Sequence, residues 1–310
     1  MDQERPKIAV VGSINMDLVV RCERIPQPGE TLHASGFAEI AGGKGANQAV
    51  AAARAGGEVT MIGCVGHDAF ADRLVAGLRD AGVNTDGVKP TECPSGIALI
   101  TVSDCGENQI LVVAGANAAV SPQYVQQHAE QIAAAEVLLL QLEIPLPGVL
   151  KAIEIAKAAG TRVILDPAPA STELPEELWD VDLLCPNSSE AQIIAAGHTD
   201  PHLALIPLAA ELQRRGPNAV AITIGKSGTI LFENDRGNLV PAFETHVRDT
   251  TAAGDAFAGA LAVAWAGGAS LADAVRVGNA AGSLSAAKDG AQPSLPTKSE
   301  IEVKLQENHS

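Results

Sequence analysis

Short runs of aliphatic and β-branched residues alternate along this chain with longer Ala-rich stretches whose apolar residues recur at helical spacing. This alternation is typical of an α/β protein, in which a parallel sheet is covered by helices on both faces. The short runs predict strands over residues 7–11, 59–65, 137–142, 162–165, 183–185, 219–224 and 229–232. The longer stretches predict helices over residues 45–55, 69–81, 122–135, 146–159, 188–196, 202–215, 253–266 and 271–287.

Two regions interrupt this alternation. Segments 18–20 and 30–40 read as strands with no helix between them, and so do segments 97–102 and 109–113. We therefore expect a small second sheet outside the main one. The sequence contains no linker, internal repeat or low-complexity tract, so residues 1–310 are expected to form one domain with this sheet as an excursion from about 18–40 and 97–113.

Composition and charge narrow the class of protein. The chain has 310 residues, of which 46% are hydrophobic and 19% charged, as expected of a soluble globular protein. Its formal net charge of −16 argues against a nucleic-acid partner, which requires clustered Lys and Arg. A polar N-terminus and the lack of a long apolar run predict a cytoplasmic location with no membrane contact. The five cysteines are odd in number and lack C-x-x-C spacing, which favours reduced thiols.

A turn of small residues precedes an acid at the start of a predicted helix, in the string DTTAAGDAFAG over residues 249–259. The backbone amides of Ala252, Ala253 and Gly254 can approach an anion closely, and the first helical turn adds partial positive charge. Asp255 follows at once, where it can accept a proton from an attacking hydroxyl group. The alternative is an acid that only complements the helix dipole.

Other polar residues follow the predicted strands at the edge where an open α/β sheet binds ligands. Asn15 and Asp17 come after the first strand, Glu143 after segment 137–142, and Asn187 after segment 183–185. Asn15, Asp17 and Glu143, with Asn47, offer the acceptors and amide donors that a sugar requires. Gly42 and Gly43 would let the backbone approach a sugar ring. The alternatives are turn residues at 15 and 17, a flexible Gly-Gly connection and a polar helix position at 47.

A larger set of motifs resembles the ribokinase-like carbohydrate kinases, and within that family the ribokinases. The strings VGSINMD (11–17), PGET (28–31), GGKGANQ (42–48), AGAN (114–117), QLE (141–143), DPAPA (166–170), PNSSE (186–190) and GAQPS (290–294) occur in the family's order and spacing. The resemblance runs from about residue 7 to the final helix. It implies a three-layer α/β/α fold with a mostly parallel central sheet and a small β-sheet lid over the sugar. The lid often pairs with a second subunit in this family, so a homodimer is expected.

The resemblance also implies an activity and a set of site residues. The activity is ATP-dependent phosphorylation of D-ribose at the 5-hydroxyl, with Asp255 as general base and the amides of Ala252, Ala253 and Gly254 as an anion hole. The implied sugar contacts are Asn15, Asp17, Gly42, Gly43, Lys44, Asn47, Glu143 and Asp255. The implied ATP contacts are Asn187, Thr223, Gly225, Gly228, Gly254 and Asn279. Ala252 departs from the Gly that many relatives carry there, which we expect to alter packing and not to abolish activity.

Two cations are implied as well. Glu190 is expected to act on Mg²⁺ through water, although Asn187 followed by Glu190 is also the pattern of a helix capping box. The residues implied around a K⁺ activator are Asp249, Thr251, Ser285, Lys288, Gly290 and Ser294. Alternative functions are phosphorylation of another substrate, such as 2-deoxyribose, fructose or a nucleoside, and an inactive sugar-binding regulator.

Overall fold

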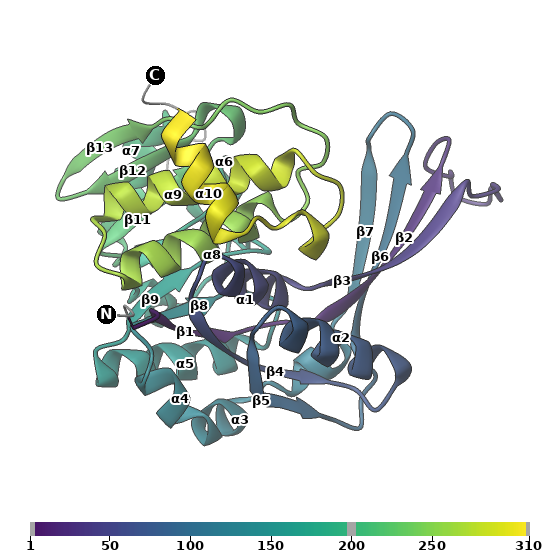
Figure 1. The fold of residues 1–310 in the computed structure, drawn as a ribbon, viewed down its shortest axis with the longest axis horizontal. Coiled ribbons are helices and arrows are strands. Elements are labelled where there is room, and N and C mark those ends of the chain that lie inside the picture. Colours follow the sequence, from purple (N-terminus) through teal and green to yellow (C-terminus); the bar gives the residue numbers. More distant parts are fainter. Residues whose placement is uncertain (1–3, 197–202, 308–310) are drawn as a thin grey trace.

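The architecture is described from a computed structural model, which covers residues 4–196 and 203–307 (Figure 1). A nine-stranded sheet forms its centre, with the strand order β13-β12-β11-β10-β9-β8-β1-β4-β5. All pairs from β5 to β11 are parallel, and β12 and β13 are added antiparallel at one edge, so the predicted mostly parallel sheet is confirmed. The strands are β1 (Lys7–Val11), β4 (Glu58–Val65), β5 (Asn84–Pro90), β8 (Val137–Leu140), β9 (Arg162–Leu165), β10 (Leu183–Leu184), β11 (Ala219–Thr223), β12 (Thr229–Glu233) and β13 (Arg236–Val240).

Helices cover both faces of this sheet and form two separate cores. One face packs against α1 (Lys44–Arg54), α2 (Ala69–Asp80), α8 (Ala253–Ala266), α9 (Leu271–Ala286) and α10 (Lys298–Gln306). The other face packs against α3 (Pro122–Gln127), α4 (Ala129–Ala133), α5 (Leu146–Ala159), α6 (Ser188–Ala195) and α7 (Leu205–Arg214). Successive side chains of a strand point to opposite faces of the sheet. In β1, Ile8 and Val10 therefore enter the first core, and Ala9 and Val11 enter the second. The three-layer α/β/α arrangement is thus confirmed.

The lid is a four-stranded sheet that projects from one side of the molecule (Figure 1). Its strand order is β3-β2-β6-β7, with β2 (Asn15–Cys22), β3 (Gly36–Gly42), β6 (Gly96–Ser103) and β7 (Asn108–Val113). The prediction of these strands was right in position and wrong in extent. Strand β2 begins at Asn15 because its backbone pairs with β6 from Gly96 onward, and residues 30–35 precede β3 without strand structure.

Several predicted elements differ from the structure. The helix predicted over 122–135 is two helices that meet at His128, whose φ of −109° and ψ of 17° depart from helical values. Strands β5 and β13 were not predicted, because their sequences NTDGVKP and RGNLV contain residues that are poor in strands. These two strands form because their backbones pair with β4 and β12, although their composition does not favour strands. The start predicted at His202 lies outside the described residues, and α7 begins at Leu205.

Two further sequence expectations concern cysteines and membranes. All five cysteines are free thiols; Cys22, Cys64 and Cys185 are buried, and Cys93 and Cys105 are exposed. This agrees with the expectation of reduced thiols. None of the described helices combines the length and the apolar character needed to cross a bilayer.

Candidate active site

The candidate site lies where β1, β8, β9 and β10 end and where α1 and α8 begin. Asp255 is in the first turn of α8 and Lys44 is the first residue of α1. Glu143 and Asp166 follow β8 and β9, which are neighbours in the sheet. Parallel strands thus deliver Glu143 to this edge, as the sequence predicted, and Asp166 beside it.

Asp255 is buried, with 5% of its surface exposed, and both of its carboxylate oxygens are held by α1. Oδ2 accepts a hydrogen bond from Asn47 Nδ2 at 3.0 Å, and Oδ1 accepts one from Gln48 Nε2 at 3.1 Å. Helices α1 and α8 approach closely at Gly259, where a Cβ would lie 2.6 Å from Ala51 Cβ. The carboxylate is therefore fixed in orientation by two side-chain amides.

The turn before α8 offers backbone amides, though not the same three that the sequence suggested. Ala253 N–H donates to the carbonyl of Thr250 at 3.2 Å, so it is already used within the turn. The amides of Ala252, Gly254 and Asp255 have no hydrogen-bond acceptor within residues 4–196 and 203–307. Ala252 adopts φ 59° and ψ 9°, a left-handed conformation that costs a non-glycine residue about 1–2 kcal/mol. Such strain is typical of functional sites.

The lid contributes the residues expected to bind a sugar. Asn15 lies opposite Gly42 in the β2–β3 pair, and Asp17 lies two residues further along β2. A Cβ at Gly42 would lie 2.2 Å from an Asp17 carboxylate oxygen, and one at Gly43, where φ is 86°, would lie 2.7 Å from the Asn15 nitrogen. Gly42 and Gly43 are thus required by close approach and do not form a flexible connection, and Asn15 and Asp17 are strand residues.

Glu143 lies at the N-terminus of α1. It accepts hydrogen bonds from Lys44 N–H at 3.1 Å and from the hydroxyl of Ser13. Asn117 fixes Asn15, because its Nδ2 donates to Asn15 Oδ1 at 2.7 Å. The polar groups from β2, α1 and the β8 end are therefore already arranged before any ligand arrives.

Burial and mutual repulsion raise the pKa of two of these acids. Burial, followed by the charges of Glu143 and Asp255, raises the pKa of Asp17 to about 7. Burial also raises the pKa of Asp166 to about 7, although Lys44 opposes that shift. Both groups therefore change charge near neutral pH.

Among the described residues, Lys44 places its cation beside several of these acids. Its ammonium lies 3.4 Å from Asp166 Oδ2. Burial would lower its pKa, but Asp166, Asp255, Glu190 and Glu143 together raise it, so Lys44 stays charged. Four acids around one ammonium leave an excess of negative charge, which favours a ligand that brings cations of its own.

A cavity of about 720 Å³ adjoins the first turn of α8. It is bounded by α8, α9, the start of α6 and the loop between β11 and β12. All six residues expected to contact ATP line it, namely Asn187, Thr223, Gly225, Gly228, Gly254 and Asn279. The structure therefore brings together residues that are spread over some ninety positions, from 187 to 279.

Asn279 shapes this cavity through the protein's own hydrogen bonds. Its Oδ1 accepts from Thr229 Oγ1 at 2.6 Å, and its Nδ2 donates to the carbonyls of Val240 and Pro241 at 3.0 and 3.2 Å. Gly228 has φ 110°, and a Cβ there would lie 2.2 Å from the Val240 carbonyl oxygen. Both residues therefore fix the segment that follows β13 as a wall of the cavity.

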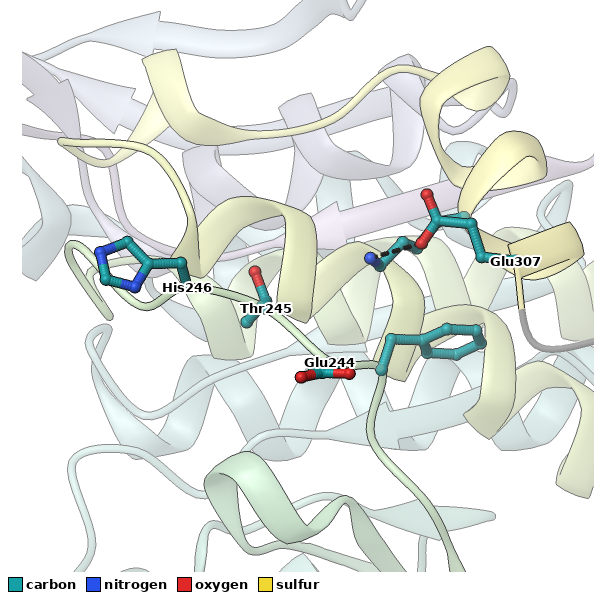
Figure 2. Close-up of a pocket in the computed structure, with 6 residues that line it drawn as sticks. Glu244, Thr245, His246 and Glu307 are labelled. Atoms are coloured by element: carbon teal, nitrogen blue, oxygen red, sulfur yellow. Dashed lines mark hydrogen bonds and ion pairs between the residues drawn. The ribbon is translucent and has the colours of Figure 1, made fainter.

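A second, open pocket of about 550 Å³ lies beyond that wall (Figure 2). It shares Phe243, Glu244 and Thr245 with the larger cavity. His246 and Glu307 also line it, and Lys304 pairs with Glu307 at 2.6 Å. None of the residues singled out in the sequence lies here.

Asn187 and Glu190 form a capping box at the start of α6, so that interpretation is confirmed. Asn187 Oδ1 accepts from Glu190 N–H at 2.9 Å, and Glu190 Oε2 accepts from Asn187 N–H at 2.8 Å. Within the described residues, no group of three or more His, Cys, Asp or Glu side chains could hold a metal ion. The arrangement fits Mg²⁺ only if phosphates and water supply most ligands, as Mg²⁺ often requires.

Of the residues implied around K⁺, Asp249 and Thr251 lie just before α8, Ser285 lies in the last turn of α9, and Lys288, Gly290 and Ser294 follow α9. Asp249 Oδ1 accepts from Thr251 N–H at 2.9 Å, and Asp249 Oδ2 accepts from Gly290 N–H at 2.9 Å. Ser285 and Ser294 pair through their hydroxyls at 2.8 Å. The Lys288 ammonium pairs instead with Glu300 of α10 at 2.7 Å, so only its backbone could face a cation. Oxygen atoms of this kind suit K⁺.

Sequence reasoning assigned no role to several residues that the structure places in the site. Gln48 and Asp166 contact the Asp255 network directly, Gln141 supports Gln48, and Ser13 and Asn117 hold Glu143 and Asn15. All five carry a signal only as members of the short motifs quoted from the sequence. Their hydrogen-bond partners are about a hundred residues or more away in the sequence, so no local pattern predicts the contacts.

The comparisons with known proteins agree with this geometry. The family described as pfkB family carbohydrate kinase matches residues 5–298, and the chain belongs to this family. A ribokinase of Haemophilus influenzae is 37% identical over 297 residues, covering 96% of this chain and 97% of that protein. A deoxyribokinase of Salmonella typhi is 39% identical over 257 residues, covering 82% and 84%. The protein is therefore an enzyme, a carbohydrate kinase of the ribokinase type.

A solved structure supports the same assignment. The ribokinase of Arabidopsis thaliana, complexed with ribose and ATP, aligns with a TM-score of 0.89 at 33% identity, covering 98% of this chain and 99% of that one. The fold and the family expected from the sequence motifs are both confirmed.

Proposed function

We propose that the protein transfers the γ-phosphoryl group of ATP to the 5-hydroxyl of D-ribose, giving ribose 5-phosphate. The observation that carries this proposal is the position of Asp255 between two sites. Its neighbour Gly254 lines the 720 Å³ cavity, while its carboxylate accepts from Asn47 and its charge acts on Asp17 of the lid. A base in that position can serve a hydroxyl on one side and a nucleotide on the other.

The polar side chains near the lid match the chemistry of ribose. Asp17 and Glu143 offer carboxylate oxygens to hydroxyl groups, and Asn15 and Asn47 add amide groups. As the 5-oxygen forms its bond to the γ-phosphorus, the bond to the ADP oxygen breaks, and the hydroxyl proton passes to Asp255. Asp255 can accept it because each carboxylate oxygen retains acceptor capacity beyond its one amide contact.

The start of α8 stabilises the charge of the transferring group. The free amides of Gly254 and Asp255 and the positive end of the helix dipole face the nucleotide cavity, and Lys44 adds a full charge nearby. Mg²⁺ carried with ATP would offset the polyphosphate charge, with Glu190 acting through water. Asp249, Thr251, Ser285, Lys288, Gly290 and Ser294 would hold K⁺ beside the turn, where its charge would order the turn that precedes α8.

Phosphorylation of 2-deoxyribose is a second candidate, because a deoxyribokinase is among the relatives. The number of acceptors favours ribose. A pocket built to pair a hydroxyl penalises the sugar that lacks it, since a buried polar group is then left without a partner. Asp17, Asn47 and Glu143 together offer more hydrogen-bond acceptors than a deoxy sugar can use.

The test is a coupled assay of ATP consumption with ribose, 2-deoxyribose, fructose, adenosine and no sugar. We expect the highest kcat/KM for ribose, with 2-deoxyribose clearly behind. Adenosine is expected to be poorest, because Phe37 is the one aromatic residue in the first lid segment and is 63% exposed. Preference for another sugar would refute ribose as substrate, and silence across the panel would favour a sugar-binding regulator.

A further inference from the structure

The side chain of Gln48 lies between two buried carboxylates from distant parts of the chain. Its Nε2 donates to Asp255 Oδ1 at 3.1 Å and to Asp166 Oδ2 at 2.9 Å, and its Oε1 accepts from Gln141 Nε2 at 2.6 Å. Gln48 and Gln141 have no exposed surface. Both amide protons of Gln48 are therefore committed to carboxylates, and water cannot take the place of either.

The orientation of the amides follows from the acids. A carboxylate oxygen that carries no proton can only accept hydrogen bonds, and Gln48 Nε2 donates to one oxygen of Asp166 and to one of Asp255. The oxygen of Gln48 then faces the nitrogen of Gln141, which leaves Gln141 Oε1 buried without a partner among the described residues. Asn47 Oδ1 is left in the same state, since Asn47 Nδ2 donates to Asp255. An unpaired buried oxygen is unfavourable, so the orientation of these amides is set by the acids and not by the needs of their own oxygens.

The amide also separates two acids that would otherwise interact directly. Neighbouring carboxylates in contact tend to share one proton, and one of them then ceases to be a base. The N–H groups of an amide do not titrate, so Gln48 bridges Asp166 and Asp255 without lending either a proton. Lys44 lies 3.4 Å from the same Asp166 oxygen and balances its charge from the other side.

We propose that Gln48 is a positioning residue for phosphoryl transfer, which fixes the plane of the Asp255 carboxylate and prevents it from sharing a proton with Asp166. This rests on the proposed role of Asp255 as general base. Gln48 does not line the nucleotide cavity, so its role concerns turnover and not nucleotide binding. Its effect is exerted through Asp255 and not on the substrate.

The test compares Gln48→Met, which keeps the length of the side chain, with the wild-type enzyme. We expect kcat with the best sugar of the panel to fall by about ten- to hundredfold, the effect of losing a hydrogen bond to a charged group. The KM for ATP should change by less than about twofold. Gln141→Met is the matched control: it removes a buried amide that has no hydrogen bond to Asp255, and its loss of kcat should be clearly smaller.

A double-mutant cycle separates positioning from general damage to the core. In an Asp255→Asn background, Gln48→Met should reduce the residual rate by less than about twofold, because there is no base left to position. Equal losses in both backgrounds would overturn the proposal, as would wild-type kcat in folded Gln48→Met. If Gln48→Met does not fold, Gln48→Glu is the second variant, because it keeps the shape of the side chain. It should also lose turnover. Wild-type kcat in Gln48→Glu would likewise overturn the proposal. Absence of sugar phosphorylation by the wild-type enzyme would refute the proposed function instead.

Discussion

At the scale of single residues, the site depends on acids whose surroundings differ sharply. Burial raises the pKa of Asp17 to about 7, whereas hydrogen bonds from Thr251 and Gly290 outweigh burial and lower the pKa of Asp249. The first acid changes charge near neutral pH and the second stays ionised. This contrast leads to a prediction about stability and pH.

The free energy of unfolding should respond to pH through Asp17. Its folded pKa of about 7 lies above the ordinary value of 3.8, so between these values the folded state holds a proton that the unfolded chain releases. This group's contribution to stability is therefore greatest below the unfolded pKa and is lost as the pH rises through about 7. Relative to wild type, Asp17→Asn should gain stability from about pH 5 to about pH 8, measured by urea unfolding.

Asp249→Asn is the matched control for that experiment. Because the pKa of Asp249 is lowered, this acid is ionised in both states above about pH 5, and its contribution is constant there. The difference between Asp249→Asn and wild type should therefore be flat over the same range. A flat difference for Asp17→Asn as well would contradict the prediction.

Asp255 leads to the second prediction at this scale. Asp255→Asn should reduce kcat by about a hundred- to ten-thousandfold while sugar and ATP still bind, since loss of a general base has this size. Isothermal titration and steady-state rates measure the two effects separately. Asp273→Asn is the control, because Asp273 is an exposed acid in the first turn of α9 whose side chain accepts a hydrogen bond from Ser270 at that helix start. Near-normal turnover of Asp255→Asn would remove this acid from the mechanism.

At the scale of elements, two helix starts and the loops beside them assemble the chemistry. Helix α8 is preceded by the strained Ala252, and the loops around Asp249 and Gly290 are joined by a hydrogen bond of 2.9 Å. A cation held between these loops would act on the amides of α8 without touching a substrate. We therefore expect a cation bound here to raise the rate without changing the reaction.

Turnover should be markedly higher in K⁺ than in Na⁺ or Tris at equal ionic strength. Backbone carbonyls of these loops and hydroxyls such as those of Ser285 and Ser294 would supply the oxygen ligands. Asp249→Asn should abolish most of the difference, measured as kcat at saturating Mg²⁺ and ATP. Asp289→Asn is the control, since Asp289 is in the same loop but pairs with Arg248 at the surface. Equal rates in all three buffers would refute the K⁺ site.

At the scale of the whole molecule, the lid has an exposed apolar edge strand. All six residues of β7 are exposed, and Ile110, Leu111, Val112 and Val113 are 50–62% exposed. An apolar edge strand of this kind is normally covered in a native protein. A second copy of the chain, lid against lid, would cover it.

We predict a homodimer, seen in sedimentation as a species of twice 31.7 kDa at micromolar concentration. Leu111→Glu should shift the equilibrium to the monomer, because a charge would be buried in the contact between lids. Val303→Glu is the control: Val303 is 60% exposed on α10, away from the lid. A species of 31.7 kDa alone in the wild-type protein would contradict the dimer.

The sequence by itself determined the layers of this fold and most of the positions of its site. Alternating short apolar runs and Ala-rich helical stretches are local signals, so β1, β8 and the helices around them could be predicted without the structure. Motifs of glycine and acid predicted Asp255 and Gly42 as site residues for the same reason, whereas the resemblance to a known family predicted the residues that line the 720 Å³ cavity. Each local signal lies within a few residues of the feature that it predicts.

Tertiary structure alone decided the edges of the sheet and the hydrogen bonds within the site. Strands β5 and β13 form because a neighbouring strand pairs with them, not because their residues favour strands. Gln48 and Asp255 are 207 residues apart, as are many partners in a fold whose parallel strands are joined by long crossovers. Hydrogen bonds extend only about 3 Å, so which amide meets which acid depends on how α1, α8 and β9 pack together, and no local pattern in the chain records it.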